Sequence, residues 1–209
     1  MKEYIDISCP ISNEITTYKD KRDVKVVQVK SFEKDSVNES RVELGSHTGT
    51  HVDAPLHFTA KGKTIDQLDL RAVNGKCKVL DFTHVTSKIT SKDLQSKKIE
   101  EGDIVLLKTS NSNLPTESKF ELNFVYLDKT GAEFLAKLRV KAVGVDYLGI
   151  ERSQPAHETH ITLFEANVWV IEGLRLKAAK ESEEYYLHCL PLLVKGMEAA
   201  PARAILIKR

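Results

Sequence analysis

The residues of this chain that could do chemistry are concentrated in one short segment, Ser46–Phe58, with the sequence SHTGTHVDAPLHF. It holds three of the seven histidines and one aspartate, namely His47, His51, Asp53 and His57. A helix would turn Asp53 away from the first two histidines, and the glycine and proline of the segment disfavour a helix. In an extended chain successive side chains alternate, so we expect these four odd-numbered residues to project to the same side.

The four polar groups form a ligand set suited to a divalent metal ion. Imidazole nitrogens and a carboxylate oxygen are ligands for zinc, and they also suit manganese or iron. Gly49 lets the backbone approach a bound ion, and Asp53 has two oxygens that could bridge a pair of ions. The alternative is a set of surface histidines without a function, but the added Asp53, His57, Gly49 and Pro55 favour the metal site.

A second carboxylate is placed where apolar side chains are usual. Glu172 ends the run that begins at Val168, and strand alternation puts it on the same face as Val168 and Val170. A charged carboxylate buried there costs several kcal/mol unless a cation or hydrogen bonds compensate it. Taken alone, Glu172 is more simply interpreted as a glutamate at a strand end that meets solvent or a lysine. Upstream, His157 and His160 are three residues apart at a predicted helix start, and the spacing leaves open which of them points inward.

The composition excludes several classes of protein. The 209 residues carry 31 Lys and Arg against 30 Asp and Glu, without a basic cluster, so we expect no nucleic-acid partner. No apolar stretch approaches the roughly 18 to 20 residues that span a bilayer, and the N-terminus does not resemble a signal peptide, so we expect no membrane partner. The three cysteines are far apart, which favours a reduced, cytoplasmic protein rather than a disulfide framework.

The elements that must position these residues alternate between strands and helices. We expect a single α/β domain over residues 1–209, with a mixed sheet and flanking helices and without repeats or a linker. Gly196–Pro201 is interpreted as a turn. The expected strands are 4–8, 24–32, 77–82, 103–108, 142–146, 168–172, 184–190 and 204–208. The expected helices are 91–98, 130–138 and 159–166.

These motifs together resemble the metal-dependent hydrolases of the cyclase superfamily, which include bacterial kynurenine formamidases. The resemblance covers nearly the whole chain, and its first motif is long and specific. It rests on HTGTHVDAPLHF at 47–58, the interval of twelve residues between His160 and Glu172, IEGL at 171–174, LPL at 190–192 and PARA at 201–204.

The resemblance implies roles for the site residues. His47, His51 and Asp53 would bind a first metal ion, Asp53 and Glu172 would be bridging or shared carboxylates, and His160 would bind a second ion. His57 would be the catalytic acid and base. The implied fold is a swivelling β/β/α domain, the implied cofactor is zinc or manganese as one or two ions, and the implied assembly is a homodimer or a higher homo-oligomer.

The resemblance is weaker where a substrate would bind. Formamidases of this family resemble one another in a Trp-Pro-Gly-Asp type turn near residue 18, whereas this chain has Thr17-Tyr18-Lys19-Asp20. Tyr18 could still stack against an aromatic substrate.

The expected activity is hydrolysis of an amide bond in a small molecule. The favoured substrate is an aryl formamide such as N-formylkynurenine, attacked by metal-activated water with His57 moving the proton. Two alternatives stay open: a hydrolase or cyclase acting on a cyclic amide such as an isatin-like ring, and a non-catalytic metal-binding protein. A serine or cysteine nucleophile is disfavoured, because the chain has no Gly-x-Ser-x-Gly elbow, and Cys189 is interpreted as a buried structural thiol.

Overall fold

The regular elements of the chain are strands and short helices, described for residues 3–208 in the computed structural model. The strands are β1 (Tyr4–Asp6), β2 (Lys25–Lys30), β3 (Glu39–Glu43), β4 (His51–Asp53), β5 (Asn74–Asp81), β6 (Lys88–Ile89), β7 (Ile104–Lys108), β8 (Tyr126–Leu127), β9 (Ala142–Val145), β10 (Trp169–Glu172), β11 (Tyr185–Pro191) and β12 (Ala199–Lys208). The helices are α1 (Phe32–Asp35), α2 (Ser91–Gln95), α3 (Lys129–Leu138) and α4 (Glu158–Glu165). Every strand and helix that the sequence predicted is present.

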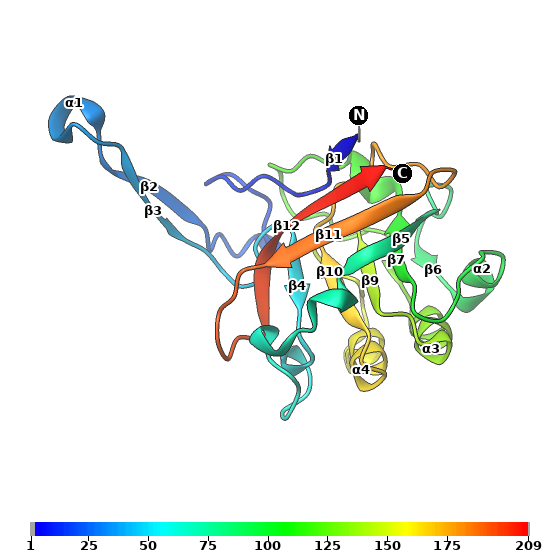
Figure 1. Ribbon diagram of the computed structural model, residues 1–209. Coiled ribbons are helices and arrows are strands. Elements are labelled where there is room, and N and C mark those ends of the chain that lie inside the picture. The colour runs from blue at the N-terminus through cyan, green and yellow to red at the C-terminus, as the bar shows by residue number, and fades with distance from the viewer. Residues whose placement is uncertain (1–2, 209) are drawn as a thin grey trace.

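A mixed sheet that closes on itself forms the centre of the molecule (Figure 1). Its strand order is β1-β12-β11-β5-β7-β9-β10-β4, and β4 pairs in addition with β12. The run from β12 to β4 is therefore a closed barrel. Strands β5, β7, β9 and β10 are parallel to their neighbours in this series, and the other pairs are antiparallel. The predicted α/β class with a mixed sheet and flanking helices is confirmed.

The barrel wall separates two hydrophobic cores. One core fills the barrel and includes Trp169 and Ile171 of β10. The other lies between the outer face of the barrel and helices α2, α3 and α4 (Figure 1). It includes Leu135, Leu163 and Val170. Since side chains alternate along β10, each of its residues belongs to one core or the other.

The predicted turn at Gly196–Pro201 is wrong in its second half. β12 begins at Ala199, and Ala199, Ala200 and Pro201 pair with β4. The pairing that closes the barrel therefore imposes strand geometry on a segment whose glycine and proline indicate a turn.

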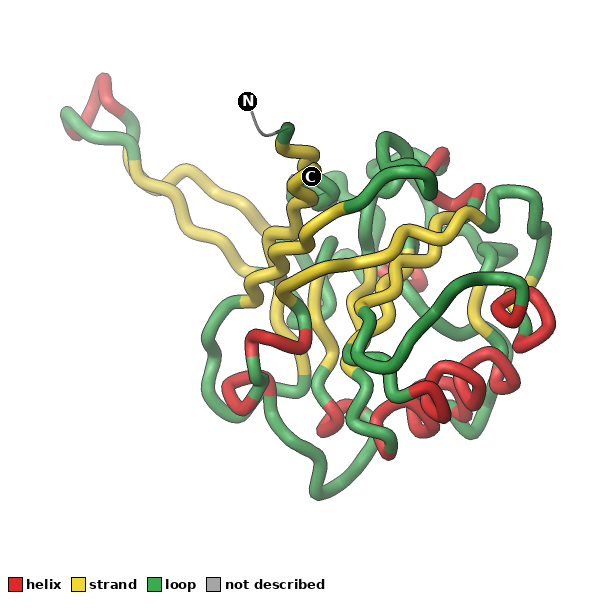
Figure 2. Tube along the Cα trace, turned by 45° about the vertical axis from the view of Figure 1, so that its right-hand side comes forward, coloured by secondary structure: helices red, strands yellow, loops and turns green. Residues whose placement is uncertain are grey.

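A two-stranded arm projects from the barrel (Figures 1 and 2). It consists of β2 and β3, with α1 at its tip, and most of its side chains are exposed. Its apolar side chains are uncovered as well, since Val29, Phe32 and Val42 are 45%, 64% and 53% exposed. The sequence did not predict β3, because its residues show no apolar alternation.

Candidate metal centre

Two neighbouring strands bring three polar side chains together on the outer face of the barrel. β4 and β10 pair antiparallel, so that His51 lies opposite Glu172 and Asp53 lies opposite Val170. Ile171, between them in the sequence of β10, faces the barrel interior. Glu172 therefore shares a face with Val170, as strand alternation predicted, and it is buried.

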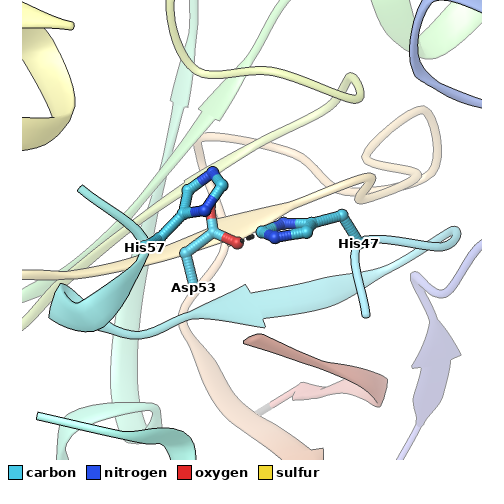
Figure 3. A group of neighbouring side chains, drawn as sticks. All are labelled: His47, Asp53 and His57. Atoms are coloured by element: carbon cyan, nitrogen blue, oxygen red, sulfur yellow. Dashed lines mark ion pairs between the residues drawn. The ribbon is translucent and has the colours of Figure 1, made fainter. Parts of the chain in front are cut away.

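His47 and His57 reach the same place by a different route. His47 lies in the turn before β4, and His57 ends a short 3₁₀ helix that follows it. The predicted extended chain over these residues is wrong, because Gly49 has a φ of +61° and Pro55 begins the 3₁₀ helix. Figure 3 shows both rings beside the Asp53 carboxylate, and His47 Nδ1 is 2.9 Å from Asp53 Oδ1.

Helix α4 supplies the fourth imidazole. His160 Nε2 lies 3.3 Å from Glu172 Oε1 and 3.7 Å from Asp53 Oδ2, and the ring is buried. His157 is half-exposed, and its ring stacks on Phe58 with centroids 4.2 Å apart. Of the two histidines that the spacing could not distinguish, His160 is the one that joins the cluster. We refer to His47, His51, Asp53, His57, His160 and Glu172 as the inner cluster.

Two further carboxylates support the inner cluster, and neither was predicted. Glu151 Oε1 lies 3.1 Å from His160 Nδ1 and 2.6 Å from His157 Nδ1. Glu151 follows the apolar run that ends at Ile150, so the argument used for Glu172 could have found it. Glu198 accepts a hydrogen bond from Ser46 and lies 3.6 Å from His47 Nε2, but no sequence pattern marks it.

Close backbone contact fixes the orientation of His51. Gly173 has a φ of +70°, and a Cβ at this position would lie 2.1 Å from the carbonyl oxygen of Gly49. The hydroxyl of Thr50 donates to the Gly173 carbonyl at 2.6 Å. The loop before β4 is thereby held against β10, where the Gly49 carbonyl lies 3.0 Å from His51 Nδ1. With Nδ1 bound to this carbonyl, His51 Nε2 faces the carboxylates, as in histidines that bind metals.

The inner cluster contains buried polar atoms without a hydrogen-bond partner among the described residues. They are both carboxylate oxygens of Asp53, His51 Nε2 and His160 Nδ1. His47 Nδ1 is close to Asp53, but the contact lacks hydrogen-bond geometry. Buried polar groups are almost always satisfied, and Asp53 and His51 offer the oxygen and nitrogen atoms that divalent metals bind. The residues therefore fit a metal ion.

The ligand atoms also lie close enough to share an ion. His51, Asp53 and Glu172 offer atoms within 4.8 Å of one another, and so do His47, Asp53 and His57. Asp53 belongs to both groups, which is consistent with the bridging position that the resemblance implied. His57 is close to the other ligand atoms, so its position is compatible both with a metal ligand and with a catalytic acid or base.

The buried charges shift the pKa of each group. Burial opposes the charged form of His51, yet Asp53 and Glu172 raise its pKa to about 10. Burial likewise opposes protonation of His160, but its three carboxylate neighbours raise its pKa well above the usual value. Burial also favours neutral carboxyls, but the imidazoles lower the pKa of Asp53 and of Glu172. Imidazolium protons thus neutralise these carboxylates, a task that a metal cation would also perform.

His57 differs from the other imidazoles. Burial is the main cause that lowers its pKa to about 4, and the neighbouring His47 and His160 act in the same direction against Asp53. The ring is therefore neutral near pH 7.

A cavity of about 820 Å³ opens from the inner cluster to the surface. His47, His57, His160 and Glu172 line its inner end. Its outer rim, as we call it, consists of Tyr18, Lys19, Lys21, Phe120, Leu122 and Arg152. Tyr18 meets Phe120 edge to face, with ring centroids 4.9 Å apart, so the tyrosine noted in the sequence does line the cavity.

The molecule is a candidate metalloenzyme: it has a closed barrel, a layer of helices and a buried cluster of imidazoles and carboxylates beneath a cavity. Comparison with known proteins gives its family. The family model described as putative cyclase matches residues 5–152. The chain therefore belongs to the cyclase family, as the sequence motifs predicted.

Relatives and solved structures agree with this family. The chain is 32% identical to a kynurenine formamidase of Bacillus cytotoxicus over 98% of this chain and 97% of that protein. It is 36% identical to cyclase-like protein 3 of Oryza sativa subsp. japonica over 82% of this chain, and it spans 66% of that relative's length. A structure titled as a potential metal-dependent hydrolase with cyclase activity is 40% identical, with a TM-score of 0.90, and the match covers 100% of this chain and 99% of that chain. Isatin hydrolase A of Ralstonia solanacearum, 18% identical, shares the fold with a TM-score of 0.84 over 100% of this chain and 92% of that one.

These names bear on the predicted enzyme class. The formamidase relative and the 40% identical structure are both named as hydrolases, which confirms the prediction of a metal-dependent hydrolase of the cyclase family at that level.

Within residues 3–208, no helix is both long and apolar enough to cross a membrane. The cysteines at 9, 77 and 189 are all free thiols.

Proposed function

We propose that this chain hydrolyses the amide bond of a small aryl formamide such as N-formylkynurenine. The observation that carries the proposal is the inner cluster, whose buried, unpartnered ligand atoms lie at the end of a cavity with aromatic walls. The relationship to a kynurenine formamidase over nearly the whole chain supports the same substrate class.

The inner cluster would hold zinc or manganese, as one or two ions. His47, His51 and Asp53 would be ligands of a first ion, His160 would be a ligand of a second, and Asp53 and Glu172 would be shared. A bound divalent cation polarises a carbonyl group and lowers the pKa of water from 15.7 to about 7. Glu151, beside Nδ1 of His160, would keep Nε2 of that ring directed to the cluster.

His57 would move the proton. Because its pKa is about 4, the ring is neutral near pH 7 and can accept a proton from the attacking water. It would then give this proton to the leaving nitrogen as the carbon–nitrogen bond breaks, so that formate and an aryl amine are released. Tyr18 and Phe120 would hold the aryl group at the other end of the cavity.

A hydrolysis assay combined with metal analysis tests this proposal. We expect purified protein loaded with zinc or manganese to hydrolyse N-formylkynurenine and formanilide faster than isatin. Faster hydrolysis of isatin would favour a cyclic amide as substrate. Bound metal without turnover of any of the three would favour the non-catalytic alternative.

The proposal extends to assembly and location. An isolated two-stranded ribbon is marginally stable in water, and the arm formed by β2, α1 and β3 exposes Val29, Phe32 and Val42. We propose that a second copy of the chain covers these side chains in a homodimer or higher homo-oligomer. Light scattering of the intact chain, compared with a Phe32→Ser/Val42→Ser variant, tests this. Three free thiols are consistent with a cytoplasmic location.

A further inference from the structure

Arg152 is a cation at the cavity, and within residues 3–208 it has no anionic partner. Its guanidinium lies over the rings of Tyr126 and Phe124, 5.0 Å and 5.8 Å from their centroids. It donates hydrogen bonds of 3.3 Å to the Leu122 carbonyl and to the Ser87 hydroxyl, which are both neutral acceptors. No carboxylate of the described residues forms an ion pair with it. Stacking and neutral hydrogen bonds therefore hold the guanidinium in place without neutralising its charge.

The other charges at the outer rim do not balance Arg152. Lys19 and Lys21 also line the cavity, and each ammonium lies over the ring of Tyr18 rather than beside a carboxylate. The nearby carboxylate of Asp20 accepts a hydrogen bond from the backbone of Phe120. Asp20 is not among the residues that line the cavity.

The carboxylates that do line the cavity are already engaged. Glu172 faces His51 and His160, and Glu151 faces His157 and His160. The outer rim thus carries three positive charges, and the negative charge of the cavity is confined to its inner end. Such a separation attracts an anionic group to the rim.

We propose that the substrate carries an anionic group, such as a carboxylate, at the end remote from the scissile amide, and that Arg152 binds this group. This inference rests on the proposed amide hydrolysis and specifies its substrate class: an aryl amide that carries an anionic group at the end remote from the amide. A guanidinium suits this task because it presents several donors in a plane and binds a carboxylate through two of them.

A charge series on a common N-aryl acetamide scaffold tests the inference independently of turnover. Binding of the unreactive amides para-acetamidobenzoate, acetanilide and para-acetamidobenzylamine to the zinc-loaded protein is measured by calorimetry. We expect the anion to bind about tenfold more tightly than the neutral amide, as for one charge-assisted hydrogen bond, and the cation to bind most weakly. Arg152→Gln should abolish the preference for the anion. Arg139→Gln, which removes an exposed arginine outside the cavity, should keep it.

Hydrolysis of the corresponding formamides separates the two proposals. With para-formamidobenzoate, formanilide and para-formamidobenzylamine, we expect KM to follow the same charge order and Arg152→Gln to raise KM for the anion with kcat nearly unchanged. Equal binding of the three acetamides, or an anion preference that persists in Arg152→Gln, overturns the inference. If the charge order and its loss in Arg152→Gln are observed but no formamide is hydrolysed, the anion site stands and the proposed hydrolysis is wrong.

Discussion

The inner cluster and the outer rim of the cavity are built in opposite ways. The inner cluster takes His51, Asp53 and Glu172 from paired strands, where hydrogen bonding between β4 and β10 sets their spacing. The outer rim takes its side chains from loops and short turns, and Lys19 and Lys21 are exposed. Strands hold ligand atoms more precisely than loops do. We therefore expect changes in the inner cluster to abolish chemistry and changes in the outer rim to alter only which molecule binds.

Asp53→Asn should have the largest effect. Asp53 is the carboxylate that His47, His51 and His160 all face, and asparagine replaces its two charged oxygens with one neutral oxygen, which is a weaker ligand for a divalent cation. We expect loss of bound metal and a fall in kcat/KM of roughly 10³-fold or more, because water keeps its high pKa without the cation. Metal content and hydrolysis are measured together. Asp66→Asn, a partly buried position outside the cluster that can still accept from the Gly196 N–H, should retain both, and full metal content in Asp53→Asn would contradict its role as a ligand.

His57→Ala should separate turnover from metal binding. If the ring moves a proton and is not a ligand, kcat falls by about 10²–10⁴-fold while metal content stays at the wild-type level. His57 is close enough to His47 and Asp53 to bind the same ion. If His57→Ala loses metal together with activity, His57 is a ligand and not the proton carrier. His84→Ala, an exposed histidine, is the matched control.

Metal affinity should rise with pH. Without a cation, His51 has a pKa of about 10 and that of His160 is raised, so both imidazoles are protonated at pH 7 and must release a proton to bind metal. Two released protons give roughly a 100-fold gain in affinity per pH unit between pH 6 and 8. In the metal-free protein the raised pKa of His51 contributes stability that is present below pH 6.5 and is lost as the pH rises towards 10. Calorimetry in buffers of different ionisation enthalpy counts the protons, and zero release would show that these imidazoles are neutral before metal binds.

The difference between the two regions also explains what the sequence could predict. Strand alternation placed His51, Asp53 and Glu172 correctly, because their geometry is that of the strands that carry them. The motif correctly placed His47 and His57 near Asp53 but with the wrong geometry, since a positive φ at residue 49 and a 3₁₀ helix bring them there.

The outer rim could not be predicted in this way. Phe120 and Arg152 come from segments without periodicity, and only tertiary structure brings them to Tyr18. The arm was half predicted, because β2 has apolar alternation and β3 does not. Closure of the barrel through Ala199–Pro201 depends on pairing with a distant strand, which local residue preferences do not encode.

Glu151→Gln should have an intermediate effect, since this side chain supports the inner cluster without belonging to it. The glutamine keeps the size of the side chain but removes the charge beside Nδ1 of His160. Losing such a partner lowers metal affinity by about 10–100-fold. Competition with a chelator measures the affinity, and Glu151→Asp tests whether a carboxylate restores part of it. An unchanged affinity in Glu151→Gln would mean that packing alone orients His160.

Tyr18→Leu should have the smallest effect. It tests whether a change in the outer rim alters substrate binding without altering the chemistry of the inner cluster. A ring contact between Tyr18 and an aryl substrate would contribute about 0.5–1.5 kcal/mol, as aromatic pairs do, so losing the aromatic face should raise KM by about 2–10-fold. Because Tyr18 contacts none of the groups that would bind metal or move the proton, kcat and metal content should stay at the wild-type level. Tyr18→Phe keeps the ring and should keep KM, which distinguishes stacking from a role of the hydroxyl. A fall in kcat in Tyr18→Leu equal to its rise in KM would mean that the outer rim positions the reacting amide as well as selecting it, and the division between the two regions would not hold.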